Sequence, residues 1–285
     1  MVDQLSMREA ALAAHDAGLC VMPPREDGSK APISRWKEYQ AERPLRPRVE
    51  SWYGSRTGLG IVCGEVSGEL ELFEFDDRET YQQFKAVAKA TGLGDLVDRL
   101  ESGYLEDTPG GGFHTFYRCT EISGNTKLAR RPKKPEEMEH PKDTAKVLIE
   151  TRGSGGFAII APSAGKVHPS GKPYQLLSGG VNTIITITPE ERGELWDLAR
   201  SFDQMEKRPA GHGDKKTTGG AKASRPGDDY NERANWAEIL GLHGWVNAYE
   251  RGGTTYWRRP GKEVGVSATT NYQGSGLLYV FSTST

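Results

Sequence analysis

The sequence predicts a mixed α/β fold, in which short strands alternate with helices along the chain. Residues 4–16 place apolar side chains at helical spacing, and Gly18 follows where a helix-terminating glycine is expected. Residues 59–63 and 70–75 have the composition of two strands, and a turn containing glycine and serine separates them. Residues 78–90 then return to helical spacing.

The rest of the chain supports the same fold class. Further short strands are predicted at residues 19–22, 115–118, 147–149 and 157–161. Residues 208–227 are rich in Gly, Lys, Thr, Ala, Ser and Pro without apolar periodicity, which predicts a linker. Beyond it, residues 231–241 are expected to form a helix and residues 245–282 short strands. The expected parts are a large domain at 1–200, a flexible linker at 201–228 and a small C-terminal α/β module at 229–285.

Composition excludes several classes of protein. The 285 residues are 35% hydrophobic and 27% charged, and no apolar run approaches the roughly 18 residues of a membrane helix. The three cysteines are widely spaced, which argues against a disulfide framework and a zinc finger. The N-terminus lacks a signal-peptide pattern, so we expect a cytoplasmic protein. Because the chain stops directly after an apolar strand, we expect it to be the N-terminal piece of a longer protein.

A formal net charge of -2 means that any nucleic-acid contact must come from a local basic patch. The segment 118–134 contains one acid, Glu121, and six basic residues: Arg118, Lys127, Arg130, Arg131, Lys133 and Lys134. Pro132 and Pro135 argue against a regular helix, so we expect residues 127–134 to form a mobile loop that contacts nucleic-acid phosphates. The alternative is a solvated loop whose charge is neutralised by the acids that follow, Glu136, Glu137 and Glu139.

The first candidate site lies at the end of the strand at residues 70–75. Period-two alternation places Glu74 and Asp76 on the same face as Leu70 and Leu72, so both acids continue a buried stripe. Two charges about 4 Å apart repel by roughly 4 kcal/mol at an effective dielectric near 20. A bound cation would remove that cost. The alternative is a strand that runs into solvent with ordinary surface acids.

The second candidate site is a glycine-rich turn that leads into a strand. Gly111 and Gly112 allow close backbone approach, and their amides are suited to an anion-binding nest. His114 and Arg118 share one face of the strand, which predicts an imidazole beside a guanidinium. The alternative is a histidine that only belongs to a turn.

The third candidate site follows the apolar strand at residues 147–149. Glu150 and Arg152 share a face and supply a further carboxylate and a phosphate-binding guanidinium, or else an internal salt bridge. Further on, Lys166 and His168 lie in a polar loop that either contacts a triphosphate or is simply a turn.

The order of these pieces resembles the three motifs of archaeo-eukaryotic primases: acid-x-acid, a glycine-rich turn with histidine, and an apolar strand that ends in an acid. Two flanking segments are similar to the prim-pol domains of phage and plasmid replication proteins. They are Gly28-Ser-Lys-Ala-Pro32 upstream and His168-Pro-Ser-Gly171 downstream. The resemblance covers residues 12–174. The first motif of the family usually opens with Asp where Glu74 stands, and its second usually has Ser where Gly112 stands.

The resemblance implies an α+β fold: a primase-like core with an RRM-like sheet and a second small α/β layer. It implies that Glu74, Asp76 and Glu150 hold two divalent ions, Mg²⁺ or Mn²⁺, although Asp77 could replace one of these acids. His114 would contact the incoming nucleotide. The other expected nucleotide-binding residues are Gly111, Gly112, Arg118, Arg152, Lys166 and His168, and the expected DNA-binding residues are Lys127, Arg130, Arg131, Lys133 and Lys134.

The expected activity is templated nucleotidyl transfer in phage-type DNA replication within a bacterial host cell. The expected partners are single-stranded DNA, NTP or dNTP and a helicase domain in the full-length protein, with no membrane. The alternatives are a metal-dependent nuclease and a non-catalytic module that binds DNA or loads a helicase. In the C-terminal module, Trp245 and Trp257 either stack on DNA bases or pack in a core.

Overall fold

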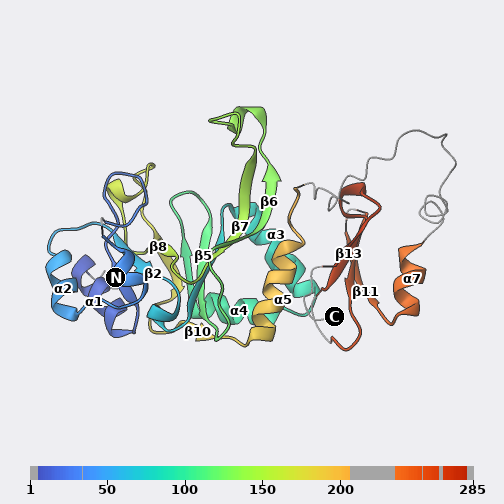
Figure 1. The fold of residues 1–285 in the computed structure, drawn as a ribbon, viewed down its shortest axis with the longest axis horizontal. Helices are drawn as coiled ribbons and strands as arrows, with labels where there is room; N and C mark the ends of the chain where they lie inside the picture. The colour runs from blue at the N-terminus through green and yellow to red at the C-terminus, as the bar shows by residue number, and fades with distance from the viewer. Residues whose placement is uncertain (1–5, 34, 206–234, 252, 263–265, 281–285) are drawn as a thin grey trace, which may run out of the picture. The chain divides into compact units, whose positions relative to one another are not determined.

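The computed structural model describes residues 6–33, 35–205, 235–251, 253–262 and 266–280 (Figure 1). The chain divides into two compact units, Met1–Asp203 and Gln204–Thr285. The predicted linker at residues 208–227 lies outside the described part of the chain. Within that part, no helix is long and apolar enough to cross a membrane.

The first unit begins with a small layer of two helices and a three-stranded sheet. Helix α1 (Met7–Asp16) starts with a capping box between Ser6 and Glu9, and Gly18 follows it with a φ of 87°. Helix α2 covers Arg46–Trp52. The antiparallel strands, in spatial order, are β1 (Cys20–Met22), β2 (Leu59–Val62) and β8 (Phe157–Ile160). The predictions for the first helix and these strands are confirmed to within a few residues.

The main sheet of the first unit has seven strands in the order β6-β7-β3-β5-β4-β9, with β10 paired in parallel to β5. Their bounds are β3 (Leu70–Phe75), β4 (Tyr104–Asp107), β5 (Phe113–Arg118), β6 (Thr126–Pro132), β7 (Ala145–Arg152), β9 (Gln175–Gly179) and β10 (Ile185–Thr186). Strands β2 and β3 follow each other in sequence but belong to different sheets. An isolated bridge between Gly64 and Leu70 connects their ends.

The two faces of this sheet have different coverings (Figure 1). The face that packs against the small layer is called the front face, and the opposite one the back face. Three helices pack on the back face: α3 (Arg78–Ala90), α4 (Gly94–Gly103) and α5 (Pro189–Arg200). Phe73 points to this side and lies 5.6 Å from Phe84 of α3 between ring centroids. On the front face, Leu70 and Leu72 join a core with α1, α2 and the small sheet. The small layer thus covers the front face up to Leu72, and Glu74 lies one position beyond on that face.

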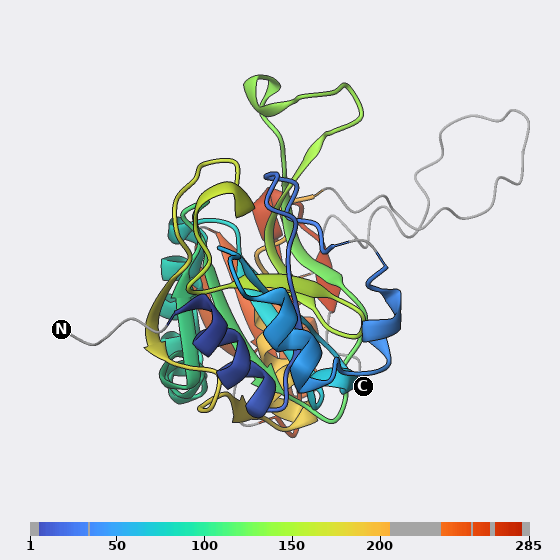
Figure 2. The ribbon, with the colours of Figure 1, turned by 90° about the vertical axis from the view of Figure 1, so that its left-hand side faces the viewer.

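A long hairpin of β6 and β7 projects from the main sheet (Figures 1 and 2). The prediction of a mobile loop at residues 127–134 is wrong, because most of this segment is strand β6, paired with β7 from Thr126 to Pro132. Pro132 is compatible with this strand since it ends an edge strand, where a missing N–H removes no bond from the sheet interior.

The second unit contains α7 and one antiparallel sheet. Its elements are α7 (Trp236–Leu242), β11 (Val246–Arg251), β12 (Thr254–Arg258), β13 (Ala268–Thr270) and β14 (Leu278–Val280). Trp257 is 4% exposed, packs with Leu240 and Ala268, and donates from Nε1 to Thr270 Oγ1 at 2.9 Å. Trp257 is therefore a core residue. The mixed α+β class predicted for the chain is confirmed.

Candidate active site

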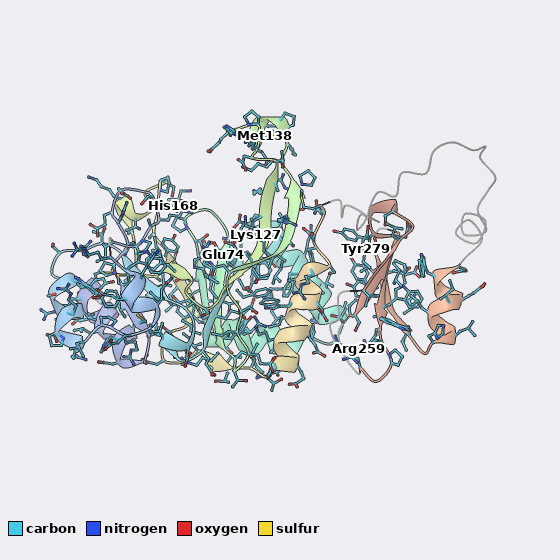
Figure 3. All side chains as sticks on the ribbon, viewed as in Figure 1. Glu74, Lys127, Met138, His168, Arg259 and Tyr279 are labelled. Carbon is cyan, nitrogen blue, oxygen red and sulfur yellow. The ribbon has the colours of Figure 1, made fainter. Side chains whose placement is uncertain are left out.

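Four polar side chains form one row across the front of the main sheet. Glu74 of β3 lies opposite Glu150 of β7 on one side and His114 of β5 on the other. His114 in turn lies opposite Glu106 of β4. Directly opposed residues point to the same face of a sheet, so the row carries three carboxylates and one imidazole side by side. Figure 3 labels Glu74 within this sheet.

Asp76 directly follows the last residue of β3 and lies beside the row. Its backbone N–H donates to Leu148 O at 3.0 Å, so the register between β3 and β7 continues past Glu74. The neighbouring Asp77 is the N-cap of α3, where its carboxylate accepts from Thr80 N at 2.7 Å. Because Asp77 is used as a helix cap, Glu74 and Asp76 are the acids that β3 presents to the front face.

The glycine-rich turn has a structural role beside the site. The amides of Gly111 and Gly112 both donate to Thr108, to its carbonyl at 2.9 Å and its hydroxyl at 3.1 Å, so both are paired within the turn, and their role in binding a nucleotide stays a prediction. A Cβ on Gly112 would lie 2.0 Å from Phe75 O. Glycine is required there because the turn packs against the chain that carries Asp76, and a larger residue would displace it.

Arg152 is the counter-cation of the two facing glutamates. Its Nε donates to Glu74 Oε2 at 2.9 Å, and its Nη2 donates to Glu150 Oε1 at 2.5 Å. Each carboxylate is mostly buried, with side-chain exposures of 16% for Glu74 and 14% for Glu150. The sequence reading of Glu150 and Arg152 as an internal salt bridge therefore describes this structure, with Glu74 as an additional member.

His114 is held between two carboxylates. Its Nδ1 lies 2.7 Å from Glu106 Oε1, and its Nε2 lies 3.4 Å from Glu74 Oε1. Burial disfavours the imidazolium, but the hydrogen bonds to Glu106 and Glu74 outweigh it and raise the pKa of His114 to about 9. His114 is therefore a cation at neutral pH.

The acids of this face differ widely in their pKa values. Burial opposes ionisation of Glu74, yet His114 and Arg152 hold its pKa well below the usual range. Burial and the charge of Glu74 raise the pKa of Asp76 to about 6. Burial, together with the charges of Glu74 and Asp76, raises the pKa of Glu150 to about 7, although Arg152 opposes this. Carboxyl groups with pKa values shifted in opposite directions on one face are frequent at functional sites.

This donor set suits a hard divalent cation in its chemistry. Carboxylate oxygens are the ligands that Mg²⁺ and Mn²⁺ prefer, and Glu74, Asp76 and Glu150 present them on one face. In the described part of the chain, no three His, Cys, Asp or Glu side chains are close enough to hold a metal as they stand. In this structure the guanidinium of Arg152 bridges two of these acids, Glu74 and Glu150.

Arg118 does not belong to the row. It lies opposite Leu70, four residues along β5 from His114, and its guanidinium donates to Gly68 O at 2.7 Å and to Ser67 O. At about 3.4 Å per residue, this separates the two positions by roughly 14 Å. The prediction that His114 and Arg118 lie beside each other is therefore wrong.

The polar loop after β8 approaches the site through an aromatic ring. The ring of Tyr174 lies 5.9 Å from that of His114 and 6.4 Å from that of His168. His168 Nδ1 lies 2.8 Å from Ser170 Oγ, and Lys166 is exposed. Tyr174 therefore lies beside both His114 and His168.

The cations of the basic segment, residues 127–134, differ in whether they are paired within the first unit. Three of them have acidic partners: Arg130 with Asp203, Arg131 with Glu137 and Lys133 with Asp143. Lys127 and Lys134 are exposed and form no ion pair with the described residues. Lys127 lies opposite Glu150 and continues the row of the active site toward the edge of the sheet (Figure 3).

Sequence reasoning missed Glu106 and the strand β4 that carries it. Glu106 is fully buried, and Tyr104 O–H donates to its Oε2 at 2.6 Å. The available signal was the spacing of Tyr104 and Glu106, which places both on one face of a short strand.

The fold is α+β, and buried acids and a buried histidine with shifted pKa values share one face of its main sheet, an arrangement typical of enzyme active sites. Residues 10–191 match the Prim-Pol family, described as bifunctional DNA primase/polymerase, N-terminal. The match spans well over half of the 285 residues, so the chain belongs to this family and is a primase/polymerase nucleotidyltransferase. The resemblance inferred from the three motifs is confirmed. No curated protein matches the chain.

Proposed function

We propose that this chain adds nucleotides to a strand paired with a single-stranded DNA template, and that Glu74, Asp76 and Glu150 hold two divalent ions, Mg²⁺ or Mn²⁺. The observation that carries the proposal is the direct opposition of Glu74 and Glu150 on neighbouring strands, with Asp76 on the same face. When bound, such ions neutralise triphosphate charge and lower the pKa of the attacking hydroxyl.

Arg152 has two roles in this proposal. In the free protein it neutralises Glu74 and Glu150. Once these carboxylates have other partners, its planar guanidinium is available for a bidentate contact with phosphate oxygens. Arg152 therefore binds the triphosphate, and its release from the two acids couples nucleotide binding to assembly of the site.

His114 supplies a second positive group on the nucleotide side. It is buried and cationic, and its Nε2 lies 3.4 Å from Glu74 Oε1. A fixed cation at this position orients an anionic phosphate without a reorganisation cost. His168 and Lys166, on the loop after β8, contact the outer part of the triphosphate.

The template lies along the β6 edge of the sheet in this proposal. Lys127 is the exposed cation next to Glu150, and Lys134 is an exposed cation further along the hairpin. We further propose that the large sheet corresponds to the RRM-like sheet of primases. The resemblance of residues 28–32 and 168–171 to phage and plasmid proteins supports a role in phage-type DNA replication, with a helicase region in the full-length protein.

The test is a product assay with single-stranded template, labelled ribo- or deoxynucleotides and either Mg²⁺ or Mn²⁺, with and without a primer. The expected result is template-dependent product whose formation requires a divalent ion. Degradation of DNA in the absence of nucleotides would instead identify a nuclease. Binding of template without any product under all conditions would identify a non-catalytic DNA-binding module.

A further inference from the structure

Glu106 is a buried carboxylate at the far end of the polar row. It is 0% exposed, and both of its oxygens have partners. Oε2 accepts from Tyr104 O–H at 2.6 Å and from the backbone N–H of Ala161 at 2.7 Å. Oε1 lies 2.7 Å from His114 Nδ1. A carboxylate that has lost its water is stabilised by this set of donors, and each contact fixes its position.

The arrangement determines which way His114 faces. A carboxylate only accepts hydrogen bonds, so Nδ1 must carry the hydrogen that it shares with Glu106. Nε2 then points to Glu74. The ring is also confined by Phe116 at 6.4 Å and Tyr174 at 5.9 Å between centroids. Glu106 supplies the directional contact, whereas these aromatic rings only limit the space.

Glu106 also connects two parts of the first unit. Ala161 directly follows β8 of the small sheet and begins the loop that carries Lys166 and His168. The same carboxylate therefore holds the start of this loop and the imidazole of β5. A change at Glu106 therefore affects how His114 and this loop are aligned, and it leaves Glu74, Asp76 and Glu150 unaltered.

We propose that Glu106 is a positioning residue that fixes the ring orientation and the protonated nitrogen of His114, so that Nε2 is presented to the nucleotide phosphates. The part that concerns the nucleotide rests on the role of His114 in the proposed function. The part that concerns the ring is independent of that role.

The test uses the Glu106→Gln variant of the full chain. Glutamine keeps the size, and its carbonyl can still accept from Tyr104 and Ala161. Its NH₂ group then faces His114 Nδ1 as a donor, so Nδ1 loses its proton and the ring becomes neutral, with its remaining hydrogen on Nε2. Nitrogen-15 spectra of the ring, assigned by the signals lost in His114→Ala, should show a protonated Nδ1 in the wild type and an unprotonated Nδ1 in the variant.

Nucleotide affinity is measured on the same proteins with ATP and dATP, in the presence of Mg²⁺ and template. Loss of an outer hydrogen-bond partner weakens a site on the order of ten- to a hundredfold, so we expect at least about a tenfold loss for Glu106→Gln and unchanged template affinity. Tyr104→Phe is the matched control, since it removes another hydrogen bond of Glu106 but leaves His114 paired, and it should keep nucleotide affinity within about twofold.

A double-variant comparison separates positioning from a structural role. If Glu106 acts through His114, Glu106→Gln causes no further loss of nucleotide affinity in a His114→Ala background. An unprotonated Nδ1 in the wild type, or an undiminished further loss in that background, would overturn the proposal. If His114→Ala alone leaves nucleotide affinity unchanged, the proposed nucleotide contact fails, while the ring spectra still decide whether Glu106 orients His114.

Discussion

Glu74 and Glu150 lie directly opposite each other on β3 and β7, and one guanidinium, that of Arg152, donates to both carboxylates. Two facing acids that are largely buried need a positive partner. In the free protein Arg152 is that partner, and in the proposed function divalent ions take its place. The exchange between an arginine and metal ions at the same two carboxylates is the basis of the account.

Replacing Arg152 with Gln should therefore destabilise the metal-free protein strongly. Removing one partner from a buried ion pair typically costs about 3–5 kcal/mol, and partial exposure of Arg152 favours the lower end. Thermal unfolding in EDTA should show this loss, and Mn²⁺ should restore much of it in the variant. A loss that Mn²⁺ leaves unchanged would show that the two glutamates do not bind the ion.

Asp76→Asn should stabilise the metal-free protein at neutral pH. The folded-state pKa of Asp76 is raised from 3.8 to about 6, so ionising this group opposes folding as the pH rises through that window. One pKa step corresponds to about 1.4 kcal/mol, and with allowance for partial exposure the gain is about 1–3 kcal/mol above pH 7. At pH 4 the two proteins should be nearly equal.

The measurement is urea unfolding in EDTA at pH 4 and pH 7.5. Asp98→Asn, at an exposed position of α4, serves as the control and should change stability by less than about 0.5 kcal/mol at either pH. A variant at Asp76 that is less stable than the wild type at pH 7.5 would refute an uncompensated carboxylate at this position.

His114→Ala should lower nucleotide affinity by about tenfold or more and leave template affinity nearly unchanged. The reason is that His114 lies within the polar row of the main sheet, whereas the exposed lysines Lys127 and Lys134 lie on the hairpin of β6 and β7. Separate titrations with a labelled nucleotide and a labelled template measure the two effects. His140→Ala, at the exposed end of the hairpin, is the control, and equal losses for both ligands would mean that His114 supports only the fold.

The cations of the β6–β7 hairpin should differ in their contribution to template binding. Lys127 and Lys134 lack acidic partners among the described residues, whereas Arg130 and Lys133 are paired with Asp203 and Asp143. Each phosphate contact on single-stranded DNA contributes about -0.7 to the slope of log affinity against log salt. Changing both Lys127 and Lys134 to Ala should therefore flatten the slope by about 1.4.

The matched variant changes Arg130 and Lys133 to Ala and should leave the slope nearly as it is. Both variants remove two positive charges, so net charge does not distinguish them. If the paired cations flatten the slope and the exposed lysines do not, the template contacts a different surface of the hairpin.

Local pattern predicted the acids well because period-two alternation is decided within one strand. Glu74 and Asp76 were expected on one face, and the structure places them there. The helix predicted at residues 78–90 is confirmed as α3, since Asp77 caps it and its apolar spacing is regular. These features depend on neighbours in sequence.

Features that depend on tertiary pairing could not be predicted in the same way. The strand β6 forms because it pairs with β7, and its own sequence of basic residues and proline resembles a loop. Gly112 had the composition of a phosphate-binding turn, but its small size serves contact with Phe75. Glu106 is important only through its position opposite His114, which depends on the order of β4, β5 and β3.

The most direct test of the central claim is the rate of nucleotide addition on a primed single-stranded template by wild type and by Glu74→Gln, Asp76→Asn and Glu150→Gln. Template affinity is measured in parallel, with Mg²⁺ and with Mn²⁺. The account predicts that each substitution lowers the rate by about a hundredfold or more while template affinity changes less than about twofold. Addition at the wild-type rate by any of these variants would contradict a catalytic role for that carboxylate.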